Sequence, residues 1–154
     1  MIDIKEYLKN ITLNFSKLGL NVEYMVESFV LNHSKEQKKG IKLPKDIAKG
    51  KLKNCFKNAA TLALMNPNFK YFEGYAVSVL GIPVLHAWVE DEGENIIDNT
   101  WKEPHKAFYL GVYFDDKTLK RELIKNEVYG LLDLGYCTNI DLIKNFKGKK
   151  VIWF

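Results

Sequence analysis

The 154-residue sequence has only two cysteines, Cys55 and Cys137. Two cysteines cannot build the disulfide framework of a small secreted protein, so we expect a reducing, cytoplasmic setting. The sequence also lacks a long apolar run, because its longest weakly charged stretch, residues 74–89, is broken by glycine, proline and histidine. A bilayer span needs roughly 20 apolar residues, so we expect no membrane segment. Residues 1–9 mix acids with lysines and predict no signal peptide.

The composition is that of one ordinary globular domain, residues 1–154. Hydrophobic residues make up 47% of the sequence and charged residues 27%, which argues against a disordered chain. We find no internal repeat, no low-complexity segment and no glycine-rich phosphate loop.

Positive charge is concentrated between Lys35 and Lys53, where eight lysines stand against only Glu36 and Asp46. Two interpretations are open. The lysines can belong to a solvated loop that aids solubility, or they can hold an acidic partner such as nucleic acid or a phosphorylated metabolite. No aromatic residue for base stacking is interleaved with them, which favours the solvated loop.

Helical spacing opens the chain. Apolar residues recur every three or four positions over residues 3–17, and Gly19 ends the pattern. A second helix is predicted over residues 22–32, which makes residues 1–34 a helical part. Residues 35–53 then contain few apolar residues but include glycine and proline, so they predict a mobile basic connection.

The centre of the chain predicts one apolar helix and a small sheet. Residues 52–65 form a mostly apolar helix, which should lie buried. Strands follow at residues 71–80, 84–91, 95–100 and 109–114, and the first three are spaced as an antiparallel meander.

The C-terminal part, residues 115–154, predicts a helix over residues 116–132 and a short helix that begins at Ile140. The apolar run at residues 151–154 should dock on the body. Together these elements predict an α+β fold, in which the central helix packs on the antiparallel meander and further helices are added at both ends.

Three side chains suited to nucleophilic catalysis occupy successive elements of this layout. Cys55 lies at the start of the apolar helix, His86 on the second strand and Asp98 on the third. If the hairpin between these strands turns near Gly93, His86 and Asp98 lie at nearly the same height. A small bulge or shift in register would then make them cross-strand neighbours on one face.

This order of residues suits thiol chemistry. A cysteine thiol has a pKa of about 8.5, and both a helix N-terminus and an imidazolium favour its thiolate. His86 would take the thiol proton and return it to the leaving group, while Asp98 would hold the other ring nitrogen. The backbone N–H of Cys55 and the side chain of Asn54 are candidates to hold an oxyanion, although Asn54 also suits a helix N-cap.

Each of these residues alone has a simpler structural interpretation. A cysteine on an apolar helix is usually a small core residue, a histidine in a strand is usually structural, and Asp98 alone can cap a turn. The conjunction of all three residues is what favours chemistry.

Aromatic residues flank the candidate site in sequence. Trp88 and Trp101 can pack beside the hairpin or, with Tyr75, contribute to an aromatic wall that binds substrate. His33 and His105 have no metal-ligand partner at short spacing. We therefore expect neither a metal nor another cofactor.

Four segments carry a resemblance to a known family. They are residues 54–60 (Asn-Cys-Phe-Lys-Asn-Ala-Ala), 73–76 (Glu-Gly-Tyr-Ala), 86–89 (His-Ala-Trp-Val) and 97–101 (Ile-Asp-Asn-Thr-Trp). They resemble the core of the transglutaminase-like, papain-like cysteine enzymes. In that superfamily a cysteine opens a helix, a histidine follows on a strand, often as His-Ala-Trp, and an acid follows on the next strand, often as Asp-Pro-Thr.

The resemblance covers residues 51–114 and implies a papain-like α+β catalytic core with a Cys55–His86–Asp98 triad. Asn99 stands where the family often has proline. The resemblance implies a class of functions, because members include acyl transferases, peptidases, amidases, deamidases and inactive relatives.

We therefore expect a cysteine-dependent hydrolase or acyl transferase that acts through a thioester at Cys55. Its substrate would be an amide or isopeptide in a peptide, a protein or a small molecule. An acyl carrier, whose phosphates the lysines would meet, is a further substrate left open. The alternative is a non-catalytic binding protein on the same fold, which would hold an acidic partner through Lys35 to Lys53.

Overall fold

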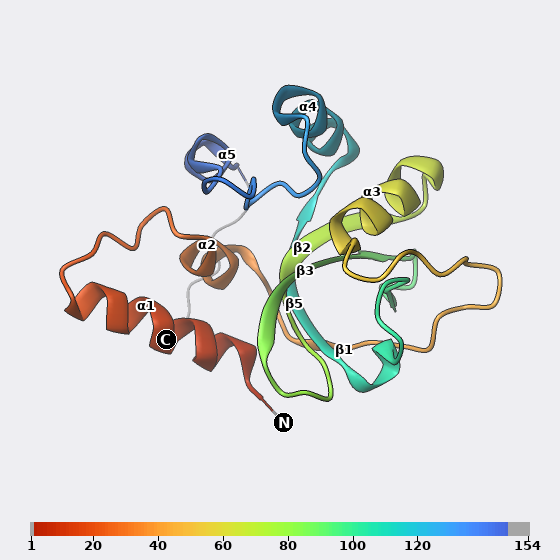
Figure 1. The fold of residues 1–154 in the computed structure, drawn as a ribbon, viewed down its shortest axis with the longest axis horizontal. Helices are drawn as coiled ribbons and strands as arrows, with labels where there is room; N and C mark the ends of the chain where they lie inside the picture. Colours follow the sequence, from red (N-terminus) through yellow and green to blue (C-terminus); the bar gives the residue numbers. More distant parts are fainter. Residues whose placement is uncertain (1, 148–154) are drawn as a thin grey trace.

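A five-stranded antiparallel sheet flanked by helices organises the computed structural model of the chain, which describes residues 2–147 (Figure 1). The α+β class predicted from the sequence is confirmed. No helix within those residues has the length and apolar character needed to cross a membrane. The predicted docking of residues 151–154 lies outside the described residues.

The helices are α1 (Ile4–Lys17), α2 (Val26–His33), α3 (Cys55–Met65), α4 (Asp116–Asn126) and α5 (Ile140–Asn145). The strands are β1 (Lys38–Lys39), β2 (Lys70–Val77), β3 (Pro83–Glu90), β4 (Ile96–Ile97) and β5 (Phe108–Phe114), and a 3-10 turn spans Pro104–Lys106.

β2 lies at the centre of the sheet, whose strand order is β1-β5-β2-β3-β4. β2, β3 and β4 form the meander that the sequence predicted, while β5 returns to pair with the other edge of β2. Gly74 of β2 is thereby paired with His86 of β3 on one side and with Gly111 of β5 on the other.

The sheet curls so strongly that residues near its two edges meet (Figure 1). Lys38 of β1 donates from Nζ to Oε1 of Glu90 on β3 (2.9 Å) and to the C=O of Glu94 in the β3–β4 turn (2.9 Å). The curved sheet therefore has a concave face, which carries Glu90 and the other side chains on the same side of β3.

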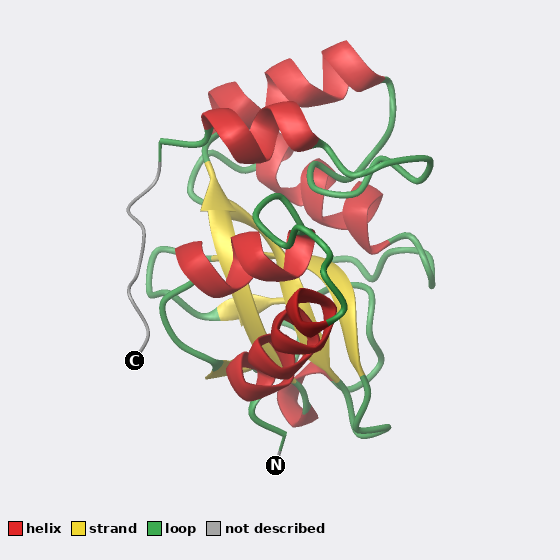
Figure 2. Ribbon diagram, turned by 90° about the vertical axis from the view of Figure 1, so that its left-hand side faces the viewer, coloured by secondary structure: helices red, strands yellow, loops and turns green. Residues whose placement is uncertain are grey.

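The two faces of the sheet are buried by different residues. The convex face packs against the helices through a large apolar cluster that includes Ala87 and Val89 of β3, and Figure 2 shows helices lying across the strands. A Cβ atom at Gly111 would lie 2.6 Å from the Trp88 ring, so glycine at this position makes room for the indole on the concave face. The concave face holds a smaller buried cluster, which consists of Ala76, Trp88, Ile96, Ala107 and Tyr109.

α3 packs closely on β3 because its buried stripe consists of small residues, Ala59, Ala60 and Ala63. The sequence predicted this helix from residue 52, but it begins at Cys55. Lys53 adopts a left-handed backbone conformation with φ 66°, which interrupts the helix before Cys55.

The third predicted strand, residues 95–100, is shortened to Ile96–Ile97. Asp98 turns the chain there, because its Oδ1 accepts a hydrogen bond from the N–H of Thr100 (2.9 Å). Such side-chain turns compete with the strand ladder, and here the turn aims the carboxylate of Asp98 at the sheet.

Two helix boundaries also differ from the predicted ones. α2 begins at Val26 rather than at residue 22, because a turn in which the N–H of Met25 donates to the C=O of Val22 (3.2 Å) precedes it. α4 ends at Asn126 rather than near residue 132, because Glu127 takes a left-handed φ of 55°.

The basic segment predicted as a mobile connection is tied to the sheet at both ends. β1 pairs with β5, and the N–H of Gly40 donates to the C=O of Ala107 (3.0 Å). Towards its other end, the N–H of Gly50 donates to the C=O of Asn99 (2.7 Å). The segment is therefore held by hydrogen bonds to residues far away in the sequence.

Glu73 anchors the residues after α4 to the centre of the sheet. The carboxylate is fully buried, and it accepts hydrogen bonds from the hydroxyl of Tyr71 (2.5 Å), the N–H of Leu131 and the N–H of Leu132 (3.0 Å). Burial raises the pKa of Glu73 to about 7, although these hydrogen bonds lower it.

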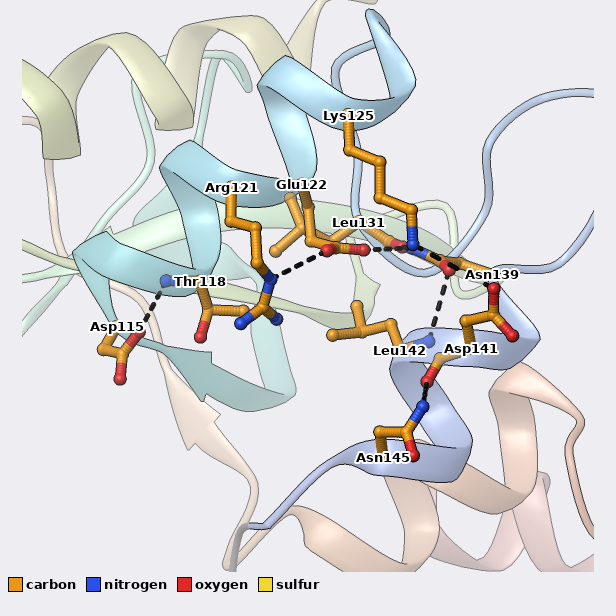
Figure 3. Close-up of polar contacts among 10 residues, drawn as sticks. All are labelled: Asp115, Thr118, Arg121, Glu122, Lys125, Leu131, Asn139, Asp141, Leu142 and Asn145. Atoms are coloured by element: carbon orange, nitrogen blue, oxygen red, sulfur yellow. Dashed lines mark hydrogen bonds and ion pairs between the residues drawn. The ribbon is translucent and has the colours of Figure 1, made fainter.

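A second buried carboxylate, Glu122, joins α4 to the start of α5 (Figure 3). It accepts from Nε of Arg121 (3.1 Å) and from Nδ2 of Asn139 (2.8 Å), and the same Nδ2 donates to the C=O of Leu131 (2.8 Å). The C-terminal helices are thus fixed to the sheet by polar contacts as well as by apolar packing.

Candidate active site

His86 and Asp98 form a hydrogen-bonded pair on the concave face. Nε2 of His86 lies 2.8 Å from Oδ2 of Asp98, and the two residues are 2% and 1% exposed. The register of β3 and β4 pairs Val89 with Ile97, and one further step sets Asp98 opposite Trp88. His86 is therefore the diagonal neighbour of Asp98 on one face, and no bulge is needed to bring the two together.

The carboxylate of Asp98 has other partners besides His86. The hydroxyl of Tyr109 donates to Oδ2 (2.7 Å), and the N–H of Thr100 donates to Oδ1 (2.9 Å). Burial alone would raise the pKa of Asp98, but the hydrogen bond with His86, followed by those from Tyr109 and Thr100, lowers it below its ordinary value. Asp98 is thus a fixed, ionised group that orients the imidazole.

Aromatic rings enclose the imidazole of His86. Trp101 stacks on it, with ring centroids 4.1 Å apart and an interplanar angle of 24°. The rings of Trp88 and Tyr109 lie at 6.3 Å and 6.2 Å from it. Trp88 is buried, whereas Trp101 is partly exposed. Both tryptophans expected near the site therefore lie beside His86, and Trp101 is the more exposed of the two.

Cys55 approaches the imidazole from the first position of α3. Its residue is 9% exposed, and its side chain lies close enough to His86 to raise the pKa of the imidazole. Because Asp98 occupies Nε2 of His86, Nδ1 is the ring nitrogen left to face the thiol. The structure thus brings all three predicted residues, Cys55, His86 and Asp98, into one chain of contacts.

The environment of His86 favours its protonated form. Burial alone would lower the pKa of His86, but the hydrogen bond to Asp98 and then the nearby side chain of Cys55 outweigh it and raise the pKa to about 9. The imidazole therefore holds a proton readily when it lies between a carboxylate and a thiolate.

Asn58 and Thr100 connect the helix of Cys55 to the turn of Asp98. Nδ2 of Asn58 donates to Oγ1 of Thr100 (2.9 Å) and to the C=O of Lys51 (2.9 Å). Asn58 lies three residues after Cys55, so both side chains face the same side of α3. This bridge fixes the position of the thiol relative to Asp98.

Our sequence interpretation missed Asn58 and Tyr109. A signal for Asn58 was present, because it is a polar residue at helical spacing from Cys55 in a mostly apolar helix. No comparable signal marked Tyr109, since its contact with Asp98 depends on the strand order, which places β5 two strands away from β3.

Two other expected site residues do not join this cluster. Asn54 is exposed at the N-cap position of α3, and its side chain makes no capping hydrogen bond. Tyr75 follows Gly74 in β2 and therefore points to the convex face, where it lies close to Glu27 of α2. Neither side chain takes part in the contacts that join Cys55, His86 and Asp98.

Two cavities of about 720 Å³ each lie outside the triad. One opens between α4 and α5 around Arg121 and Asp141 (Figure 3). The other lies in the concave face and is bordered by Trp88 and Tyr109. The second cavity therefore reaches rings that pack near His86, but neither cavity is lined by the triad itself.

Among residues 2–147, no group of three or more histidine, cysteine, aspartate and glutamate side chains is arranged to hold a metal ion. Cys137 is exposed, and Cys55 and Cys137 are both free thiols.

Comparisons with protein-family models, with curated proteins and with solved structures found no match for the chain.

Proposed function

We propose that the protein is a cysteine-dependent hydrolase or acyl transferase that acts on an amide or isopeptide through a thioester at Cys55. The observation that carries the proposal is the position of His86. This buried imidazole lies beside the Cys55 side chain and, 2.8 Å away, hydrogen-bonds to Asp98. A base held between a thiol and a fixed carboxylate is what activation of a cysteine nucleophile requires.

In the acylation step, the thiol proton moves to Nδ1 of His86, and Sγ of Cys55 attacks the carbonyl carbon of the amide. The new C–S bond pushes the carbonyl electrons onto oxygen. Within α3 the first backbone hydrogen bond joins the N–H of Asn58 to the C=O of Asn54 (2.9 Å), so the N–H of Cys55 lies ahead of the helical ladder and suits the oxyanion. The imidazolium then protonates the leaving nitrogen as the C–N bond breaks, which leaves a thioester.

In the deacylation step, His86 takes a proton from water or from an acceptor amine, which attacks the thioester carbonyl. Collapse of this second intermediate breaks the C–S bond and returns the proton to sulfur. Water gives a carboxylic acid, and an amine gives a new amide. The residues around Cys55 support both outcomes, because the acceptor differs while the proton transfers are the same.

The resemblance to transglutaminase-like, papain-like enzymes supports the same chemistry. The order of a helix-opening cysteine, a strand histidine and an aspartate after the next strand agrees with the contacts of Cys55, His86 and Asp98. We extend the proposal to the fold on this basis, as a papain-like core spanning residues 51–114.

Trapping the acyl-enzyme tests the proposal. The chain is mixed with p-nitrophenyl acetate, quenched in acid and analysed by peptide mass spectrometry. We expect an acetyl group on the peptide that contains Cys55 and none on the Cys55→Ala variant, while Cys137→Ala is acetylated like the unaltered chain. In a protein that only binds its partner, p-nitrophenyl acetate would acetylate Cys55 no faster than Cys137, and that result would refute the proposal.

A further inference from the structure

Four exposed lysines, Lys49, Lys51, Lys53 and Lys57, stand on either side of the start of α3, and we call them the lysine rim. Lys53 precedes Cys55 by two residues and Lys57 follows it by two. Because consecutive Cα atoms are about 3.8 Å apart, the backbones of both lysines lie within roughly 8 Å of the Cys55 backbone.

Hydrogen bonds hold the rest of the lysine rim beside the turn of Asp98. Asn99, the neighbour of Asp98, accepts from the N–H of Gly50 (2.7 Å) and donates from Nδ2 to the C=O of Ala48 (3.2 Å), so it clamps the backbone on both sides of Lys49. The C=O of Lys51 accepts from Asn58 on α3 (2.9 Å). The backbone of this part of the lysine rim is therefore held beside the site rather than in a free loop.

The positive charge of the lysine rim has no acidic partner in the structure described. None of the ion pairs found among residues 2–147 involves these four lysines, and residues 47–57 contain no aspartate or glutamate. Lys38, in the same basic segment, differs from them because Glu90 neutralises it at 2.9 Å.

From this arrangement we infer that the lysine rim binds the acidic side chains of a peptide substrate and thereby sets the specificity of Cys55. The inference rests on the proposed function and names its substrate class, a peptide with aspartate or glutamate residues next to the amide that is attacked. Unpaired charges that border a reactive group attract a ligand of opposite charge and orient it over that group.

A peptide fits these observations better than a nucleic acid does. An amide is the group that the triad attacks, and a peptide supplies it together with carboxylates. Base stacking needs exposed aromatic rings. The exposed ring of Tyr129 lies beside the rim, but Lys57 already lies over it, with Nζ 5.9 Å from the ring centroid.

Binding to the Cys55→Ala variant of the full chain tests the inference without turnover. Fluorescein-labelled peptides of about ten residues, rich in glutamate, glutamine or lysine but otherwise identical, are titrated and followed by anisotropy. We expect the glutamate peptide to bind roughly tenfold more tightly than the glutamine peptide at low ionic strength, and this preference to shrink near 0.15 M salt.

Two matched variants locate the effect. Replacing Lys49, Lys51, Lys53 and Lys57 by glutamine should abolish the preference for glutamate. The same change at four exposed lysines elsewhere, Lys17, Lys39, Lys120 and Lys144, should keep the preference although it removes the same charge. Equal binding of the glutamate and glutamine peptides, or equal loss in both variants, would overturn the inference.

An oligothymidylate of about ten nucleotides tests nucleic acid as the alternative partner. If it binds more tightly than the glutamate peptide, the lysine rim serves nucleic acid and the inference fails. Acetylation of Cys55 in the unaltered chain reports on the proposed function independently. Acetylation without a preference for glutamate would refute only the inference, whereas a preference without acetylation would refute the thiol chemistry and leave the lysine rim as a binding surface for acidic peptides.

Discussion

The Nε2 atom of His86 lies 2.8 Å from the Oδ2 atom of Asp98, where the side chains expose only 3% and 1% of their surfaces. Burying such a pair is costly unless its remaining polar atoms are satisfied. Tyr109 and Thr100 satisfy the carboxylate, and Cys55 meets the other side of the imidazole. A buried network of polar side chains of this kind is easier to explain by the proposed catalysis than by stability.

Removing the hydroxyl of Tyr109 should weaken the pair without displacing it. In Tyr109→Phe, Oδ2 of Asp98 loses a hydrogen bond, so the pKa of Asp98 should rise towards its ordinary value. The net value of one such bond is about 1 kcal/mol, which corresponds to a loss of about fivefold in the acylation rate of Cys55. The rate of acetylation by p-nitrophenyl acetate measures this effect. Tyr113→Phe, at a more exposed position of the same strand, is the matched control and should acetylate at the normal rate.

The bridge between Asn58 and Thr100 should affect the alignment of the thiol. Asn58→Ala removes the donor, and Thr100→Val removes the acceptor while keeping the backbone N–H that bonds Asp98. Each change should slow acylation by roughly tenfold, and the double variant should be no slower than Asn58→Ala, because Asn58→Ala already removes the bond that Thr100→Val breaks, together with the bond to the C=O of Lys51. Thr61→Val, on the exposed side of α3, is the control. Additive losses in the double variant would show that the two side chains act separately.

The pKa of His86, raised to about 9, predicts how activity depends on pH. Above that pH the imidazole loses its proton and can no longer protonate a leaving amine. Turnover of an amide should therefore fall above about pH 9, as measured by steady-state kinetics on a peptide amide. Acetylation by p-nitrophenyl acetate should fall less, because nitrophenolate leaves without a proton. Parallel profiles for the two substrates would contradict the role of His86 as the acid.

Glu73 predicts a separate dependence of stability on pH. Burial raises its pKa in the folded state to about 7, above its ordinary value of 4.5. Its contribution to the free energy of unfolding is therefore complete below pH 4.5 and is lost as the pH rises through 7. Relative to Glu73→Gln, the unaltered chain should lose on the order of 2 kcal/mol across this range, measured by urea unfolding. Equal slopes for the two proteins would mean that Glu73 does not titrate there.

The sequence was informative where structure depends on local residues. The three- and four-residue spacing in residues 3–17 matches α1, and Gly19 follows its end with φ 81°. The alternation in residues 84–91 put His86 on the same face as Trp88, as β3 has it. The types and order of Cys55, His86 and Asp98 sufficed to select them, because few functions need this combination.

Long-range pairing could not be predicted from local patterns. β1 has only two residues, and its place in the sheet depends on β5, about seventy positions later. For the same reason, the sequence did not reveal that Tyr109 contacts Asp98 or that Asn99 holds the backbone of the lysine rim in place. Tyr75 was misplaced for a related reason, since its face became clear only once β2 was paired with His86 through Gly74.

Competitive alkylation of the two free thiols tests most directly whether His86 activates Cys55. The folded chain is treated with limiting iodoacetamide at neutral pH, and labelling of Cys55 and Cys137 is followed by mass spectrometry in the unaltered chain and in His86→Gln, with circular dichroism to confirm folding. The account predicts that Cys55, although 9% exposed, reacts faster than the exposed Cys137, and that His86→Gln removes this advantage. If Cys137 reacts as fast or faster, and His86→Gln leaves the ratio unchanged, Cys55 is not an activated nucleophile.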